Sequence, residues 1–162
     1  MAKKKPLAPA PLVQPIPAGY HAVTPYLIVR GAARALEFYA KAFGAKELFR
    51  LPLSGGKIGH AEIRIGDAHI MLADEFPEQG FKSPQSLGGS PVSLMLYVED
   101  VDQRFQQALA AGAKELRPVK DQFYGDRAGT LVDTFGHVWT LATHKEDVSH
   151  EELLRRSASE QA

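Results

Sequence analysis

The sequence contains no cysteine among its 162 residues. Disulfide bonds, thiolate nucleophiles and cysteine-ligated zinc are therefore excluded together, and the composition is compatible with a reducing cytoplasm. Neither sign of charge is in surplus, because nineteen basic residues balance nineteen acidic ones. A chain without a net positive field has little attraction for nucleic acid or for an anionic membrane surface, so neither is expected as a partner.

Long apolar runs are missing as well. Stretches such as 26–29 and 94–98 are far too short to span a bilayer, and the amino-terminal Met1–Lys5 stretch is charged and lacks the apolar segment of a secretory signal. Hydrophobic residues make up 44% and charged residues 23% of the chain, which is typical of globular proteins. We therefore expect a soluble cytoplasmic protein with one sizeable core or two small, associated modules.

What is present is an internal repeat. The string Gly-Ala-Lys-Glu-Leu occurs at residues 44–48 and again at 112–116. Each copy ends an amphipathic helical pattern and begins a strand pattern, so we interpret the chain as two diverged copies of one supersecondary unit. A protein built from two such halves is expected to hold its binding site between them.

The first copy, module one, is predicted to span residues 20–74. Its helix is indicated by Ala35, Leu36, Tyr39 and Phe43, which recur at spacings of three and four, and Gly44 is the expected terminating residue. The predicted elements are a strand at 20–29, the helix at 32–43, and strands at 46–53, 57–65 and 68–73.

Module two, residues 91–143, repeats this order after a connection at 75–90 that is rich in proline, glycine and serine and long enough to cover a cavity. Asp100 is the predicted N-cap of its helix. The predicted elements are a strand at 92–98, the helix at 101–111, and strands at 114–119, 126–132 and 138–143. Outside the modules lie a proline-rich arm at 1–19, and a charged tail at 144–162 in which Ser149 and Glu152 form the capping box of a short helix.

Five sequence motifs occur in an order that resembles the vicinal oxygen chelate superfamily, which contains glyoxalase I, extradiol dioxygenases and the bleomycin and fosfomycin resistance proteins. Within this superfamily the motifs resemble those of the PhnB-like branch, and the resemblance covers residues 20–147. The motifs are Thr24-Pro25-Tyr26-Leu27, Glu37-Phe38-Tyr39, Gly59-His60-Ala61-Glu62-Ile63, Tyr124-Gly125-Asp126-Arg127 and Asp133-Thr134-Phe135-Gly136-His137-Val138-Trp139.

The resemblance implies an α+β fold in which two βαβββ modules form curved mixed sheets around a cup-shaped cavity, and it implies a homodimer. In the metal-dependent members, histidine, glutamine or glutamate side chains from the first and fourth strands of each module hold a divalent ion in the cup. The four matching positions in this chain are Thr24, Met71, Ser93 and Thr140. Hydroxyls and a thioether suit such an ion poorly, so we expect no metal cofactor at these positions.

Period-two alternation adds further side chains to the cup: Tyr26, His69, Met95 and Tyr97. The third strand is expected to present His60, Glu62 and Arg64 there, because its other face is uniformly apolar. His60 and Glu62 are the candidate catalytic pair, serving as a base and its orienting partner or binding an ion off the usual positions. The alternative is an ordinary surface strand whose polar groups satisfy one another and water.

Tyr124, Asp126 and Arg127 form a second candidate group for ligand binding. Matching Met71 with Thr140 across the repeat predicts that Arg127 points inward, where its guanidinium suits a carboxylate or phosphonate, with Asp126 holding it in place. The alternative is a structural ion pair that orders the preceding loop.

Together these patterns favour a protein that binds a small aromatic or oxygen-rich organic ligand without the usual metal, as in resistance-type sequestration. Two alternatives stay open at this point. One is a glyoxalase-like lyase, isomerase or dioxygenase with a metal held by non-standard ligands, and the other is an interaction module whose pocket has lost its role.

Overall fold

The computed structural model describes residues 13–160, so the first part of the proline-rich arm lies outside the described residues. From Val13 the chain has no regular strand until Tyr26, although a strand was predicted from Tyr20. Pro25 explains the late start, because proline has no N–H with which to join a ladder. Its carbonyl oxygen already accepts a hydrogen bond from the Met71 N–H at 2.9 Å, so pairing begins one residue before the strand.

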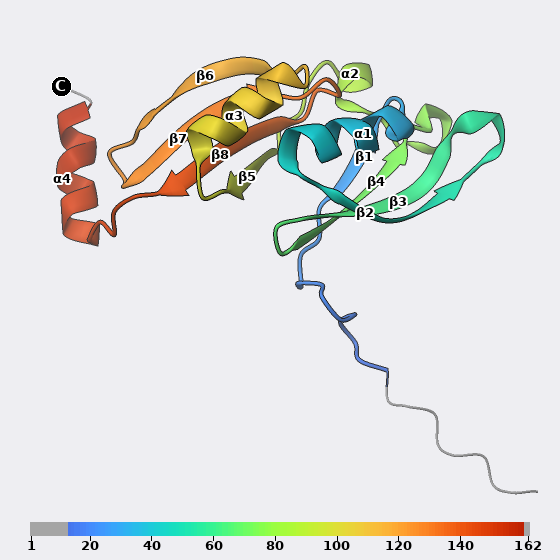
Figure 1. Ribbon diagram of the computed structural model, residues 1–162, viewed down its shortest axis with the longest axis horizontal. Helices are drawn as coiled ribbons and strands as arrows, with labels where there is room; N and C mark the ends of the chain where they lie inside the picture. The colour runs from blue at the N-terminus through green and yellow to red at the C-terminus, as the bar shows by residue number, and fades with distance from the viewer. Residues whose placement is uncertain (1–12, 161–162) are drawn as a thin grey trace, which may run out of the picture.

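Two four-stranded mixed sheets form the protein, and they confirm the predicted α+β fold of two βαβββ modules (Figure 1). In each sheet the first strand pairs in parallel with the fourth, and the other pairs are antiparallel. The strand orders are β1-β4-β3-β2 and β5-β8-β7-β6. The strands are β1 Tyr26–Val29, β2 Lys46–Pro52, β3 Ile58–Ile65, β4 Ala68–Asp74, β5 Ser93–Tyr97, β6 Lys114–Asp121, β7 Asp126–Val132 and β8 Val138–His144.

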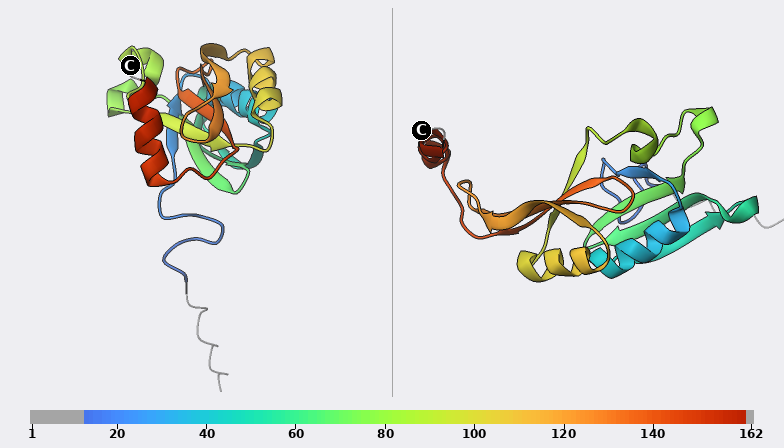
Figure 2. Two further views of the ribbon diagram at one scale, coloured as in Figure 1. Left: turned by 90° about the vertical axis from the view of Figure 1, so that its left-hand side faces the viewer. Right: turned by 90° about the horizontal axis from the view of Figure 1, so that it is seen from above.

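The two principal helices, α1 (Ala32–Phe43) and α3 (Val101–Ala110), lie end to end along the same side of the two sheets (Figures 1 and 2). Helix α1 has the predicted bounds and ends at Gly44, whose φ of 68° is left-handed. Asp100 accepts a hydrogen bond from the Gln103 N–H at 3.0 Å and confirms the predicted cap of α3. We call the face of each sheet turned away from these helices its open face.

Helix α1 has glycine at its N-cap, so its first amides are satisfied from another element. The Asp74 carboxylate, at the end of β4, accepts from the N–H groups of Gly31 and Ala32 at 2.8 and 2.9 Å. In module two the equivalent position is Thr143, whose hydroxyl accepts from the Val101 N–H at 2.9 Å. The last strand of each module therefore supports the start of that module's helix, which is local evidence for the repeat.

One buried carboxylate, Asp133, joins the two modules. It follows β7 and accepts hydrogen bonds from the Tyr39 hydroxyl of α1 at 2.8 Å and from the Trp139 indole N–H at 2.9 Å. The backbone N–H groups of Phe135 and His137 also donate to it. Burial, and then the neighbouring Asp133 charge, hold the pKa of Tyr39 well above its usual value, so the phenol stays a donor.

The connection between the modules contains a short 3-10 helix at Pro77–Gln79 and helix α2 (Pro84–Leu87). Its anchor is Glu75, whose carboxylate accepts from the Ser83 hydroxyl, the Ser86 hydroxyl and the Arg30 guanidinium at 2.6–2.7 Å. Those hydrogen bonds, with Ser86 contributing most, lower the pKa of Glu75 to about 2.

Glu75 is expected to make the stability of the protein depend on acid. Its pKa is lower in the folded protein than in the unfolded chain, so the stabilisation is complete above about pH 4.5 and is lost as the pH falls toward 2. Between pH 5 and pH 3 the wild type should lose about 2 kcal/mol more unfolding free energy than Glu75→Gln. Urea denaturation at both pH values measures this difference. Glu78→Gln, in the same connection but exposed, should behave like the wild type.

The sheets stay open within one chain, so a single copy does not enclose the expected cup.

Helix α4 (His150–Glu160) begins at the predicted capping box, where the Glu152 N–H donates to the Ser149 hydroxyl at 3.3 Å. It stands at the far end of module two (Figure 1). Across residues 13–160, no helix combines the length and apolarity needed to cross a membrane.

Candidate functional site

The open face of module one carries the candidate site. Four residues lie in one row across its strands because they are register partners in β1, β4, β3 and β2: Tyr26, Met71, Glu62 and Phe49. His60, two residues from Glu62 on β3, pairs in register with Leu51 of β2. The structure thus places four of the predicted residues, Tyr26, His60, Glu62 and Met71, on one surface.

Tyr26, His60 and Glu62 form a hydrogen-bonded chain. The Tyr26 hydroxyl lies 2.9 Å from His60 Nδ1, and His60 Nε2 lies 3.2 Å from Glu62 Oε1. Both contacts are satisfied when the neutral imidazole carries its proton on Nε2, donating to Glu62 and accepting from the phenol. The rings of Tyr26 and Phe49 flank the imidazole, with centroids 5.5 and 5.6 Å from it.

This chain of contacts leads from an exposed group to a buried one. Tyr26 is 48% exposed, whereas Glu62 is only 6% exposed. Glu62 Oε2 is buried and has no hydrogen-bond partner within residues 13–160. Burial raises the pKa of Tyr26, so its phenol remains protonated at neutral pH and is a proton donor. Buried polar atoms without a hydrogen-bond partner are rare and cost free energy, so an unpaired carboxylate oxygen below a histidine and a tyrosine is unusual for a surface with only a structural role.

Two cavities adjoin Tyr26. One, of about 310 Å³, lies over β1 and β3 beneath the connection between modules, and its walls are largely apolar. It is lined by Tyr26, Ile28, Leu53, Gly59, Ala73, Asp74, Phe76, Gln79 and Phe81. The other, of about 270 Å³, lies between β1 and the start of β5 and includes Leu87 and His137. Phe76 and Phe81, which bracket the 3-10 helix, pair through their backbones and hold this part of the connection beside Tyr26.

Module two presents a different open face. There Met95, Thr140, Thr130 and Arg117 are register partners across β5, β8, β7 and β6. Thr130 therefore takes the place that Glu62 has in module one, and Ala128 that of His60. Ser93 also lies on β5, where it pairs with Val138. The positions of Tyr26, His60 and Glu62 are therefore held in module two by Met95, Ala128 and Thr130, which cannot form the same hydrogen-bonded chain.

The expectation that Arg127 points into the cup is wrong. Arg127 pairs with Asp102 of α3 at 2.7 Å and with Asp121 at 3.2 Å, so it lies on the helix side of the sheet. The turn between β7 and β8 is longer than the turn between β3 and β4. An alignment that counts back equal distances from Met71 and Thr140 therefore places β7 one residue out of register. A shift of one residue exchanges the two faces of a strand.

Asp126 does not hold Arg127 but binds Tyr97 and His144 on the open face. Its carboxylate accepts from the Tyr97 hydroxyl at 2.8 Å and lies 2.7 Å from His144 Nδ1. Hydrogen bonds to Asp126 and then Asp147 raise the pKa of His144, and the bond to Asp126 raises that of Tyr97. Tyr124, in the preceding turn, lines a separate cavity of about 440 Å³ on the open face of module two.

The positions that hold the metal in related folds do not fit a divalent cation. Met71 and Thr140 supply a thioether and a hydroxyl from the two fourth strands, and Ser93 and Thr24 supply only hydroxyls. Within residues 13–160, no group of three histidine or acidic side chains is placed to hold an ion. His60 and Glu62 bring two such donors together and no third.

The other predicted site residues of module one lie outside the hydrogen-bonded chain Tyr26–His60–Glu62. Arg64 and His69 are register partners at the far end of β3 and β4. His69 stacks on Tyr20 at a centroid distance of 4.1 Å, which covers it with the segment before β1. Thr24 is half-buried just before β1.

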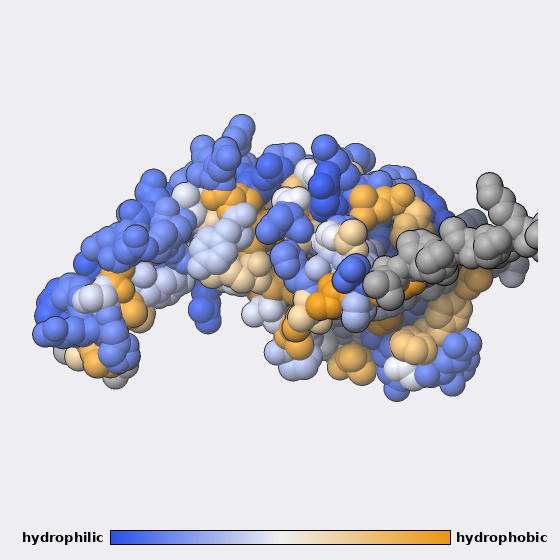
Figure 3. Space-filling model, turned by 90° about the horizontal axis from the view of Figure 1, so that it is seen from below, coloured by the Kyte–Doolittle hydropathy of each residue, from blue (hydrophilic) through white to orange (hydrophobic). Residues whose placement is uncertain are grey.

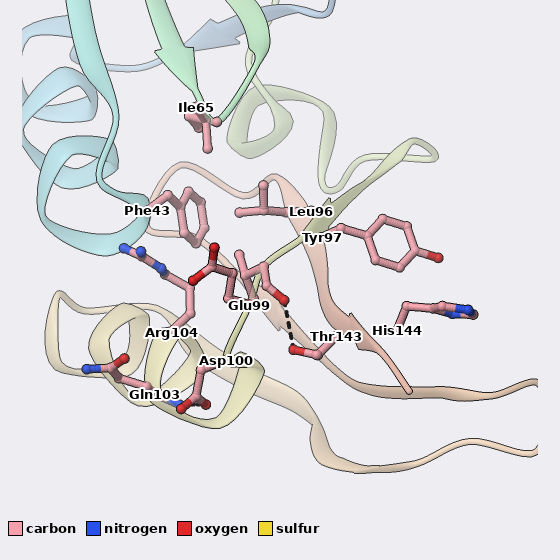
Figure 4. Close-up of a pocket in the computed structure, with 12 residues that line it drawn as sticks. Phe43, Ile65, Leu96, Tyr97, Glu99, Asp100, Gln103, Arg104, Thr143 and His144 are labelled. Atoms are coloured by element: carbon pink, nitrogen blue, oxygen red, sulfur yellow. Dashed lines mark hydrogen bonds between the residues drawn. The ribbon is translucent and has the colours of Figure 1, made fainter. Parts of the chain in front are cut away.

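A larger cavity, about 630 Å³, lies elsewhere, between the modules at the C-terminal end of α1 and the N-terminal end of α3 (Figure 4). Phe43 and Arg104 line one part of it, and Tyr97 and His144 extend from another. Only Tyr97 among the predicted site residues reaches it.

Two kinds of site residue were missed from the sequence. Phe49 and Leu51 of β2 flank His60. With Leu53 they place apolar residues at every second position, and this pattern could have assigned them to one face of the strand. Arg117 and Lys120 of β6 line the open face of module two, but two register shifts and Pro118 interrupt the alternation there.

Comparison with known proteins gives concordant results. The family model of the Glyoxalase/Bleomycin resistance protein/Dioxygenase superfamily matches residues 20–141. An uncharacterized protein of Mycobacterium tuberculosis is 45% identical over 142 residues, which cover 86% of this chain and 84% of that protein. The crystal structure of TioX from Micromonospora sp. ML1 has a TM-score of 0.60 at 25% identity, covering 80% of this chain and 100% of that one. A PhnB protein from Bacillus cereus has a TM-score of 0.60 at 21% identity, covering 76% and 99%.

Proposed function

Because the chain belongs to the Glyoxalase/Bleomycin resistance protein/Dioxygenase superfamily, we propose that it binds a small, planar organic molecule on the open face of module one. The observation that carries this proposal is the chain Tyr26–His60–Glu62, which ends beside an apolar cavity of about 310 Å³. Aromatic rings and aliphatic side chains supply the contact area, and the phenol and imidazole supply the few oriented polar groups that such sites contain.

The proposed ligand carries an oxygen atom at one end. Its flat, apolar part lies against Phe49, Leu53 and Phe81, each 43–54% exposed. Its oxygen atom meets the Tyr26 hydroxyl, which accepts a hydrogen bond while donating its own proton to His60. This arrangement requires no metal and suits sequestration of an aromatic compound.

A second copy of the chain completes the cup in this proposal. Apolar side chains remain exposed on the open faces of both modules, among them Leu51 at 55% and Met95 at 47% exposure. Apolar patches gather over module one and the middle of the molecule, whereas the α4 end is mostly polar (Figure 3). Exposed apolar side chains gathered in this way mark interaction sites. Sedimentation analysis at micromolar concentration should give the mass of two chains, and a single-chain mass would overturn this part.

A thermal-shift screen tests the proposal. Flat aromatic compounds with a single oxygen substituent, such as 2-naphthol, should raise the melting temperature in a saturable way, because a ligand that binds only the folded protein stabilises it. Small oxo acids such as pyruvate should have no effect. Stabilisation by oxo acids alone would favour an enzyme of glyoxalase type instead.

The second candidate function is a lyase, isomerase or dioxygenase that uses His60 and Glu62 with a metal ion. The buried, unpartnered Glu62 Oε2 favours it, since carboxylate oxygen is a metal ligand. Two donors are too few for a stable site, so protein loaded with Mn²⁺, Ni²⁺ or Zn²⁺ and then dialysed should retain less than about 0.1 ion per chain. Elemental analysis measures this. Stoichiometric metal that disappears in His60→Ala would establish the metal-dependent alternative.

A further inference from the structure

The open face of module two contains a cavity of about 440 Å³ that shares no lining residue with the cavities beside Tyr26. Its walls come from β6, β7, β8 and the turn between β6 and β7. They consist of Arg117, Lys120, Gln122, Tyr124, Ala128, Gly129, Thr130 and Thr140. Two of these side chains are cations and none is acidic.

We propose that this cavity binds a tetrahedral oxyanion, the phosphate or phosphonate group of a small molecule. Arg117 supplies a planar fork of N–H donors, and Lys120 supplies a second positive charge from the same strand. Neither takes part in any ion pair formed within residues 13–160. Of the acidic residues nearby in sequence, Asp121 pairs with Arg127 on the helix side and Asp126 with His144. Glu115 pairs in register with Leu131, whose side chain is in the core, so it lies on the face opposite Thr130.

Neutral donors complete the floor of the cavity. The hydroxyls of Thr130 and Thr140 lie 3.1 Å apart, so one donates to the other and the second hydroxyl hydrogen remains for an acceptor in the cavity. Tyr124 adds a phenol at the rim. Burial raises the pKa of this phenol, and the nearby Asp126 charge raises it further, so it keeps its proton.

The backbone of β6 is irregular on both sides of Arg117. Its pairing with β7 shifts register on both sides of Arg117, between Glu115 and Arg117 and again before Lys120. Such bulges bend a strand and redirect its side chains, and they are frequent beside functional sites. The turn that carries Tyr124 is held from α4, because Arg156 donates to the Phe123 carbonyl at 3.2 Å and pairs with Glu146 at 2.8 Å. In Figure 2, α4 stands beyond this end of the sheet.

The site does not depend on the ligand proposed for module one, since its residues lie on the other sheet. Titration calorimetry with inorganic phosphate and with phenylphosphonate, at constant ionic strength set by chloride, tests it. Both should bind the wild type saturably, and acetate should bind at least about tenfold more weakly because it carries one charge fewer.

Three variants locate the binding. Arg117→Gln and Lys120→Gln should each weaken phosphate binding about tenfold or more, and Thr140→Val about threefold. Arg50→Gln removes the same charge from an exposed strand of module one and should leave the affinity unchanged. Circular dichroism checks that each variant is folded. The proposal is overturned if phosphate does not bind, if Arg50→Gln weakens it as much as Arg117→Gln, or if acetate binds equally well.

Discussion

Replacing Asp133 by alanine is expected to lower the free energy of unfolding by about 3–5 kcal/mol, the largest effect of any single substitution considered for this protein. The carboxylate is only 4% exposed and accepts four hydrogen bonds. Without it, the Tyr39 hydroxyl and the Trp139 indole N–H are left unpaired in the core, and each unpaired buried donor costs about 1–3 kcal/mol. Urea denaturation followed by Trp139 fluorescence measures the loss.

Asp133→Asn provides an intermediate case. The amide keeps one acceptor oxygen but presents an NH₂ group to donors that it cannot satisfy, so we expect about half the effect of alanine. Asp147→Ala is the matched control, because Asp147 is fully exposed. It should change the stability by less than about 0.5 kcal/mol. A loss below about 1 kcal/mol in Asp133→Ala would show that the modules do not depend on this carboxylate.

Replacing Tyr26 by alanine is expected to weaken the binding of 2-naphthol on the order of 100-fold. The change removes the aromatic ring that borders both cavities and the hydroxyl that binds His60, and the two contributions together amount to about 2–3 kcal/mol. Tyr26→Phe keeps the ring and should cost only about threefold to tenfold. Fluorescence titration of the naphthol measures both.

Tyr97→Ala is the control for this series. Tyr97 is 59% exposed on the open face of module two and hydrogen-bonds a carboxylate, so the substitution removes a similar ring from the other sheet. Its affinity should stay within about twofold of the wild type. A larger loss in Tyr97→Ala than in Tyr26→Ala would place the ligand over module two.

Much of the fold was predictable because local signals and tertiary packing agree. The stripe of Ala35, Leu36, Tyr39 and Phe43 predicted α1 correctly, since the same stripe packs against the sheet. Gly44 and Asp100 end and begin helices for reasons contained within a few residues. Alternation likewise placed His60 and Glu62 on the open face of β3.

The remaining features depend on contacts between distant residues. The link from Tyr26 to His60 spans 34 positions, and the one from Tyr39 to Asp133 spans 94, so neither leaves a local pattern. Arg127 was assigned to the wrong face because turn length sets the register of β7. Arg117 was missed because bulges hide the alternation of β6.

We propose that the ligand binds on the open face of module one, beside His60. Nuclear magnetic resonance of the six histidine side chains during titration with 2-naphthol tests it most directly. The imidazole signals of His60 should move with the fraction bound, while those of His150, exposed at the start of α4, stay constant. Saturable binding that leaves the His60 signals unchanged would show that the ligand binds elsewhere.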